Sequence, residues 1–161
     1  MSNLIHVKFP DDKGIKGEVV TEGYKDQFEA TSFQFGVGRG VSYSGGKIEA
    51  TAPSFSEITL TGRFDSATND LIKAASDQAL GEVVITFLVV AGQNKPQPFL
   101  IYTLKDVYIT GVSVSSGGDM PSISISMAYL EIKSQYKKLD KDYKFLSDHE
   151  FTYNLATKVL A

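Results

Sequence analysis

The stretch from Phe35 to Lys47, FGVGRGVSYSGGK, has the composition of a phosphate-binding loop, because five of its thirteen residues are glycine and a lysine follows the last glycine. A P-loop has the pattern G-x-x-x-x-G-K-[ST], in which backbone N–H groups surround the phosphates and the lysine reaches their oxygens. Counted from Gly40, the second glycine is Gly45, and Gly46 occupies the position that the lysine requires. The dinucleotide pattern G-x-G-x-x-G also fails, because a bulky residue occupies its third glycine position and no helical pattern follows. We therefore predict no phosphate site in this stretch.

Histidines and carboxylates are the other groups with chemical potential. The chain has two histidines and no cysteine, which excludes thiolate chemistry and disulfides. His6 lies on the polar side of an alternating strand, and His149 follows Asp148, whose side chain would point to the opposite face of a strand. The carboxylates are scattered, and no serine has the G-x-S-x-G surroundings of a hydrolase nucleophile. We predict that both histidines lie on the surface, that no metal or cofactor is bound, and that the protein is not an enzyme.

The length and charge of the chain indicate one slightly acidic domain. A chain of 161 residues is expected to form a single domain, here 1–161. A net charge of -3 provides no basic surface for nucleic acid or for an anionic membrane. No apolar run approaches the ~20 residues of a membrane helix, and the first residues lack the basic and apolar regions of a signal peptide. We predict a protein without a membrane anchor that, if it leaves its cell, does so without a cleaved signal peptide.

Alternation of apolar and polar residues with a period of two predicts β-strands along most of the chain. In the segment 122–133 the parity slips after Tyr129, which indicates a bulge. The segment 81–90 is apolar on both parities, so we expect both of its faces to be covered, by a helix or by another subunit. The charged segment 133–144 is interpreted as a solvated connection. The alternating apolar residues are Ile5, Val7 and Phe9; Phe33, Phe35 and Val37; Ile123, Ile125 and Met127; and Phe151, Tyr153 and Leu155.

One helix is predicted, at about 65–80. Asp65 or Ser66 can cap its first N–H groups, Gly81 is placed to end it, and Leu71 lies among small residues on one stripe. Glycine marks residues 38–52 as a segment that leaves the sheet. The predicted fold is mainly β: an antiparallel β-barrel, or a sandwich of two sheets, with one α-helix and a long extended loop.

Five blocks of the sequence carry a resemblance to a known family. They are Gly17–Glu18 after the first strand, SFQFG at 32–36, SFSEITLTGRFDSATNDLIKAA at 54–75, YTLKDVYITGVSVSSGG at 102–118 and EFTYNLATK at 150–158. In this order they resemble the Hcp family, the haemolysin-coregulated proteins that form the inner tube of bacterial type VI secretion systems. The chain departs from the family pattern in lacking Trp, in Val19 after the Gly-Glu pair, and in Gly62–Arg63 before the helix.

The resemblance implies a structural tube subunit. It implies homo-hexameric rings that stack into a tube, driven by a contractile sheath, linked to baseplate proteins and tipped by a VgrG-type spike, with small effector proteins carried in the channel. It also implies assembly in the bacterial cytoplasm and secretion through the type VI system. The subunit-interface loop would contain Gly38, Arg39, Gly40, Val41, Ser42, Tyr43, Ser44, Lys47 and Ile48. A possible ring-interface strand would contain Val84, Thr86, Leu88 and Val90.

Two interpretations of the glycine-rich loop stay open. In the first, residues from about 39 to 52 form an assembly arm that reaches roughly 20 Å. Tyr43 and Ile48 would then pack on a neighbour, while Arg39 and Lys47 would pair with its carboxylates. In the second, the loop is a flexible surface connection, which glycine and serine also mark.

Three other functions also remain open from the sequence. A phage-like tail tube protein would share the fold and the mechanics of a secretion tube. A small-ligand-binding β-barrel would need a closed apolar pocket. An enzyme such as a glycosidase would need two carboxylates about 5–10 Å apart in a cleft.

Overall fold

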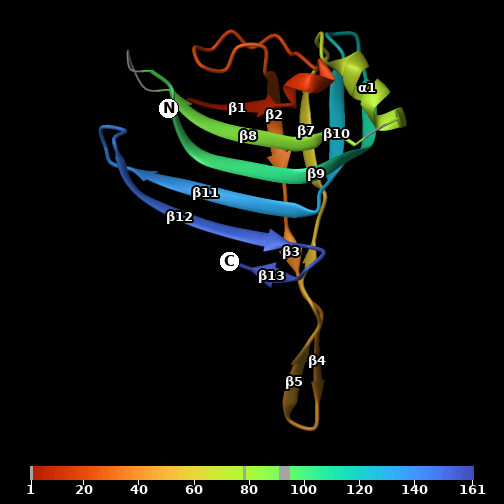
Figure 1. Cartoon of the computed structure of the whole chain (residues 1–161), viewed down its shortest axis with the longest axis vertical. Coiled ribbons are helices and arrows are strands. Elements are labelled where there is room, and N and C mark those ends of the chain that lie inside the picture. Colours follow the sequence, from red (N-terminus) through yellow and green to blue (C-terminus); the bar gives the residue numbers. More distant parts are fainter. Residues whose placement is uncertain (1, 78, 91–94) are drawn as a thin grey trace.

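The chain folds into antiparallel strands and the helix α1 (Thr68–Asp77), as Figure 1 shows. The structure, a computed structural model, describes residues 2–77, 79–90 and 95–161. A short 3-10 helix at Asp11–Lys13 follows the first strand. The strands are β1 (Ser2–Lys8), β2 (Phe28–Gln34), β3 (Val37–Gly38), β4 (Val41–Ser44), β5 (Lys47–Ala50), β6 (Ser54–Phe55), β7 (Ile58–Arg63), β8 (Gly81–Val90), β9 (Gln97–Ser115), β10 (Ser122–Ala128), β11 (Glu131–Leu139), β12 (Phe145–Asn154) and β13 (Val159–Leu160).

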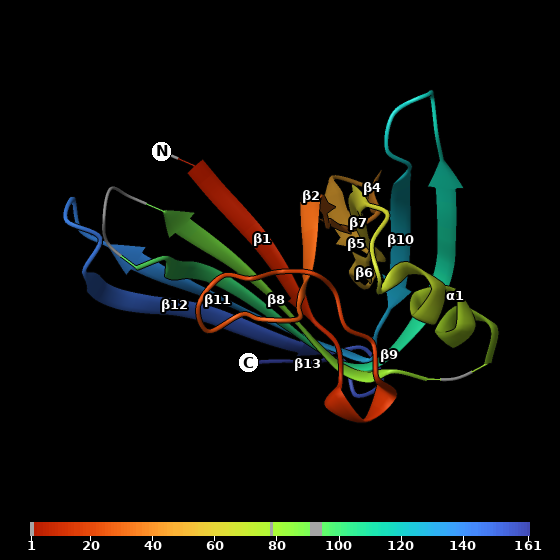
Figure 2. The ribbon, with the colours of Figure 1, turned by 90° about the horizontal axis from the view of Figure 1, so that it is seen from above.

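The main sheet closes on itself to form a barrel. Its strands follow the order β10-β7-β2-β1-β8-β9-β11-β12-β13, and β10 also pairs with β9. The strands from β10 to β9 in this order therefore form a closed ring, which β11, β12 and β13 extend on one side. The mainly β, antiparallel fold is confirmed, and of the two predicted architectures the structure has the barrel. Figure 2 shows β7, β10 and the end of β9 on one side of β2, and β8, β11, β12 and the beginning of β9 on the other.

Strand β9 belongs both to the barrel and to its extension. Its first half pairs with β8 and β11, and its second half pairs with β10. Between these halves Asp106 has a φ of 54°, in the left-handed region, and it lies opposite the interruption between β10 and β11 at Tyr129 and Leu130. The parity slip after Tyr129 thus marks the place where the barrel strand β10 gives way to the extension strand β11.

The interpretation of residues 133–144 as a solvated connection is wrong for its first half. Strand β11 runs to Leu139 and pairs with β9 on one side and β12 on the other. The pairing satisfies the backbone groups on both edges, while Lys133, Lys137 and Lys138 keep their side chains at least partly in solvent. The turn itself covers only residues 140–144.

Helix α1 is shorter than predicted at both ends but has the predicted cap and stripe. The Asp65 carboxylate accepts the Ala67 N–H at 2.9 Å, and the Asp65 N–H donates to Thr68 Oγ1 at 3.1 Å. This reciprocal pair satisfies N–H groups at the helix start. Leu71 and Ala74 are buried, as the predicted stripe requires. No helix in the described ranges is long and apolar enough to cross a membrane.

Gly81 does not end the helix, which contradicts the prediction. The helix ends at Asp77, and the Leu80 N–H already donates to the Val107 carbonyl at 2.8 Å. The chain has therefore joined the sheet before it reaches Gly81. Gly81 instead begins β8 with a φ of 97°, a conformation that favours glycine.

Apolar side chains fill the barrel and continue beneath the start of the extension. Half-buried aromatic rings pack beside this core, including Phe33 against Phe87 at 5.1 Å and against Tyr102 at 4.8 Å between ring centroids. Such contacts add to the area that the rings bury. The largest fully buried side chains are Phe28, Ile58, Leu60, Leu71, Leu80, Ile85, Leu88, Leu104, Ile123, Ile125, Met127 and Ile132.

The outer face of β1 is covered by the chain itself. His6 is only 1% exposed, so the prediction that it lies on the surface is wrong. Its Nε2 lies 3.1 Å from Thr21 Oγ1 and its ring centroid 5.6 Å from that of Tyr24, both in the segment between β1 and β2. An alternating strand shows which side is polar, but it does not show that a distant loop folds over that side. His149, by contrast, is exposed as predicted.

Candidate interaction surfaces

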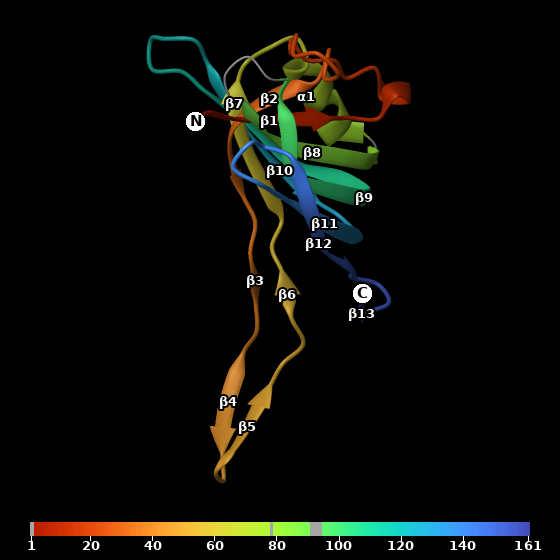
Figure 3. The same cartoon turned by 90° about the vertical axis from the view of Figure 1, so that its left-hand side faces the viewer.

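The segment predicted as an extended loop is an antiparallel hairpin that projects from the barrel, and we call residues 37–55 the arm (Figure 3). Strand β3 pairs with β6 near the barrel, and β4 pairs with β5 farther out. The tip is the two-residue turn Gly45–Gly46, with φ values of 56° and 75°. Both values are positive, which is the geometry of a type I′ turn and the reason why glycine is needed here. The glycines at 36, 38 and 40 have no such φ.

The base of the arm is attached to the barrel through aromatic residues. Phe55 stacks on Tyr153 with ring centroids 4.3 Å apart, and the Tyr129 hydroxyl donates to the Ser56 carbonyl at 2.8 Å. Burial raises the pKa of Tyr129 to about 12, so this hydroxyl keeps its proton in the physiological range. The arm therefore starts from a packed position rather than from a free loop.

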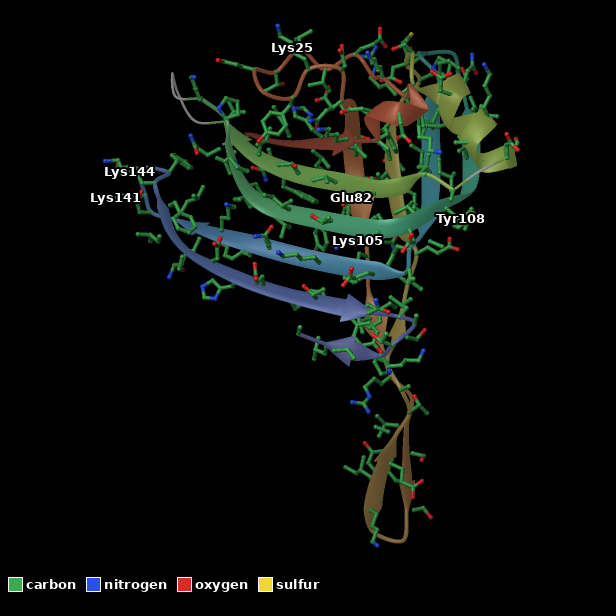
Figure 4. All side chains as sticks on the ribbon, in the orientation of Figure 1. Lys25, Glu82, Lys105, Tyr108, Lys141 and Lys144 are labelled. Carbon is green, nitrogen blue, oxygen red and sulfur yellow. The ribbon has the colours of Figure 1, made fainter. Side chains whose placement is uncertain are left out.

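The outer part of the arm has one apolar face and one polar face. Residues directly opposite each other in a hairpin share a face, and the pairs are Val41–Ala50 and Tyr43–Ile48 on one side. Tyr43 is 78% exposed and Ile48 is 67% exposed. Figure 4 shows that, of the residues that the structure describes, none outside the arm lies beside this section of it. An uncovered apolar face on an isolated two-stranded hairpin, which is marginally stable alone, indicates a surface that another molecule covers.

The polar face of the arm contains the pairs Ser42–Glu49 and Ser44–Lys47. Lys47 follows the turn and is exposed. Arg39 lies nearer the barrel, where its Nε donates to the Thr51 carbonyl at 2.8 Å. All nine predicted loop residues thus lie on the arm and are exposed, but Arg39 is already bonded within it.

The predicted ring-interface strand, β8, is covered on one face by a segment of its own chain rather than by a helix. Leu88 is fully buried and Thr86 is 7% exposed, while Val84 and Val90 are half-buried. Thr86 lies opposite His6, on the face that the segment between β1 and β2 covers. Val84 and Val90 lie near the two ends of this same face and stay half-buried. Since β1 and β9 pair with the two edges of β8, these two positions are the parts of the predicted strand that stay partly open to a neighbour.

A depression of about 500 Å³ lies at the start of β2, the end of β7 and the turn between β9 and β10. It was not predictable from the sequence, because its residues come from four separate segments. We call it the upper depression. Its lining residues are Glu18, Val19, Glu29, Thr31, Arg63, Phe64, Asp65 and Met120.

Two carboxylates of the upper depression also stabilise the start of α1. Glu18 Oε2 accepts the Ser66 N–H at 3.3 Å, and Asp65 accepts the Ala67 N–H. Burial raises the pKa of Asp65, the Ala67 N–H opposes this rise, and the charge of Glu18 adds to it. These contacts account for the proximity of the two carboxylates by helix capping. No group of metal-ligating side chains is found within residues 2–77, 79–90 and 95–161.

A second set of exposed apolar residues lies on the last two strands. Phe145 and Leu146 begin β12, and Val159 and Leu160 form β13 at the edge of the sheet. Each of the four is more than half exposed. In the sequence these residues are two adjacent apolar pairs, so their position at a sheet edge was not predicted.

Comparisons with known proteins agree with one another. The family described as "Type VI secretion system effector, Hcp" matches residues 7–136. A solved structure of a type six secretion system protein has a TM-score of 0.88 and 21% identity, covering 99% of this chain and 100% of that one. Hcp1 from Salmonella typhimurium has a TM-score of 0.77 and 18% identity, with 100% of both chains covered. A type VI secretion system effector from Yersinia pestis has a TM-score of 0.69 and 16% identity, covering 93% and 98%. No curated protein matches the chain.

Proposed function

The chain belongs to the Hcp family of the type VI secretion system, and from this we propose that it is a subunit of the secretion tube. Six copies close into a ring around a central channel, and the rings stack into a tube. The observation that carries this proposal is the arm, whose apolar face is left uncovered by the described residues of its own chain. A heterologous contact of this kind, made by every copy, produces closed rings or extended assemblies.

The contacts within a ring and between rings use different surfaces. We assign the arm, residues 38–48 in particular, to contacts with a neighbouring subunit that hold the stack together. The half-buried residues Val84 and Val90, near the two ends of β8, are assigned to the contact within the ring. The exposed apolar residues of β12 and β13 support such a contact, because a side-by-side neighbour would remove them from water.

The proposed partners are those of a contractile secretion machine. The tube lies inside a sheath, meets baseplate proteins and is tipped by a VgrG-type spike, and small effector proteins travel in its channel. The chain 1–161 is proposed to act as one domain with no catalytic step, no cofactor and no nucleic-acid partner. It is assembled in the bacterial cytoplasm and exported through the same machine without a cleaved signal peptide.

The test is to replace residues 41–50 by a short Gly-Ser link. The intact protein is expected to form a ring of about 106 kDa, six times the 17.6 kDa chain, which stacks further at high concentration. The shortened protein is expected to form the ring but not the stack, and not to be exported. Light scattering, electron microscopy and export into the culture medium measure these three properties.

A matched pair of variants separates the apolar face of the arm from its length. Tyr43→Ser with Ile48→Ser removes the apolar contact, whereas Ser42→Thr with Ser44→Thr changes only the opposite face and keeps the strand. We expect the first pair to lose stacking and the second to keep it. Normal tubes and normal export from the shortened protein would contradict the role of the arm, and a protein that stays monomeric at high concentration would contradict the ring.

A further inference from the structure

We propose that the upper depression is the receptor for the arm tip of the next copy, so that Lys47 and Tyr43 of one subunit insert among Glu29, Phe64 and Met120 of another. This inference rests on the proposed tube function, and it specifies the surface that the arm contacts. The occupant is a second copy of this chain.

The first argument is the placement of the two surfaces at opposite ends of the same strands. Strand β2 begins at the depression with Glu29 and Thr31 and leads toward the arm, and β7 returns from the arm and ends at the depression with Arg63. In Figure 3 the arm continues the direction of β2 and β7 away from the barrel. Copies aligned along this direction place the arm of one against the depression of the next. A contact between unlike ends repeats without limit, as stacking requires.

The second argument is the chemical match between the two surfaces. The depression contains three carboxylates, of Glu18, Glu29 and Asp65, and one guanidinium, of Arg63. The charge nearest the arm tip is Lys47, directly after the turn. A cation entering an acidic depression is favoured by complementary charge, which also sets the orientation of the partners.

The third argument is the apolar part of the same surfaces. Phe64 and Met120 line the depression, and Met120 is 59% exposed in the single chain. On the arm, Tyr43 is exposed beside the tip. A Tyr ring packed on a methionine side chain buries apolar area on both partners and makes a sulfur–aromatic contact.

The absence of cysteine from the chain allows a direct test by disulfide cross-linking. Ser44→Cys places a thiol at the arm tip and Met120→Cys places one in the depression. When the protein carrying both changes is concentrated and oxidised, we expect a ladder of trimers and larger species on a non-reducing gel. Peptide mapping is expected to show the mixed linkage between positions 44 and 120. Each single variant can form nothing larger than a dimer.

Two further variants serve as matched controls. Ser44→Cys with Lys141→Cys keeps the arm thiol but moves the other to the turn between β11 and β12, where Figure 4 labels the lysine. This protein is expected to give no mixed linkage. In a separate charge exchange, Lys47→Glu is expected to raise the concentration needed for stacking by about tenfold, since one pair becomes repulsive. Adding Glu29→Lys is expected to restore stacking, and adding Glu82→Lys, on β8, is not.

The outcomes distinguish this inference from the proposed function. Mixed 44–120 linkages together with rescue by Glu29→Lys support the depression as the receptor. A double-cysteine protein that gives no mixed linkage overturns it, whatever the oligomeric state of the protein. If stacking is nevertheless lost when residues 41–50 are removed, the tube function stands and the arm binds elsewhere. If the shortened arm leaves stacking intact, the proposed role of the arm fails independently.

Discussion

His6 joins β1 to the segment that folds over it, through its contacts with Thr21 and Tyr24. Burial lowers its pKa below the ordinary 6.5, while the charge of Glu29 and a backbone hydrogen bond with Ile5 oppose this change. The folded protein therefore holds the imidazole neutral at a pH where the unfolded chain already binds a proton. At the scale of the residue, this histidine makes stability depend on pH.

The sign of this dependence follows from the direction of the pKa change. Because the unfolded chain binds more protons, the free energy of unfolding falls as the pH drops below 6.5 and is unaffected by His6 well above it. We expect His6→Gln, whose amide can replace the Nε2 contact, to remove this part of the slope. Urea unfolding from pH 8 down to about pH 5, where ordinary carboxyl groups stay ionised, measures it.

Exposed His149 provides the control for this measurement. His149→Gln replaces an exposed imidazole by the same amide, so a comparison of the two variants isolates the effect of burial at position 6. A His6→Gln protein with the same slope as the unchanged chain would show that His6 is protonated equally well in the folded state.

At the scale of the elements, β2 and β7 pack closely because the large Phe28 side chain of β2 occupies the space where Gly62 of β7 has no side chain. A Cβ atom at Gly62 would lie 2.5 Å from the Phe28 ring and 2.9 Å from the Glu29 carbonyl oxygen. Phe28 is fully buried, so its ring fills the space in front of Gly62 and has little room to move. The departure of Gly62 from bulkier residues in the resemblance is therefore matched by the Phe28 ring, which reaches into the space that a side chain at position 62 would occupy.

Two glycine substitutions in neighbouring parts of the barrel test this fit. Gly62→Ala is expected to destabilise the protein by about 1–3 kcal/mol through overpacking. Gly111→Ala, in β9, is expected to change stability by less than about 0.5 kcal/mol, because a Cβ there meets nothing within 4 Å. Thermal unfolding of both variants decides the point. Equal stability of the two proteins would mean that the Phe28 ring moves aside at no cost.

The strands were predicted best where the alternation of apolar and polar residues was regular. They were predicted worst where pairing with neighbouring strands, rather than the local pattern, decides the structure. Alternation identified most barrel strands, and Asp65 located the helix start. Residues 133–139 were not predicted as a strand because of their charged side chains. They form part of β11, whose backbone hydrogen bonds are made with the neighbouring strands β9 and β12. The Gly45–Gly46 pair, with Tyr43 before it and Ile48 after it, is a hairpin signal that the sequence contains. The prediction of a loop instead rests on the further glycines at 36, 38 and 40, which free the backbone to leave the sheet.

At the scale of the whole molecule, the arm is expected to contribute nothing to the stability of its own barrel. Every residue from 41 to 50 is exposed, so removing them takes away no core contact. We expect the Gly-Ser replacement to shift the unfolding temperature by no more than about 2 °C. Circular dichroism on the ring or the monomer measures this. A drop of more than about 5 °C would mean that any loss of stacking reflects a damaged barrel.

The family and the location of the arm were predictable, whereas the upper depression was not. The family follows from short blocks in a fixed order, and such order survives when single residues change. The depression forms only after residues near 18, 29, 63 and 120 meet, and this meeting depends on the register of several strands. A local sequence pattern does not show the register between strands that are far apart in the chain.

The double pairing of β9 sets the time at which the barrel can form during synthesis. β1 leaves the ribosome early, but Phe87 in β8, which pairs with Ile5, is synthesised much later. The ring of strands cannot close until β10, which ends at Ala128, meets both β7 and β9. From β8 to β12, by contrast, each strand finds a partner close behind it in the chain. The C-terminal half can therefore assemble as it is made, while the first strands keep apolar surface exposed until most of the protein exists.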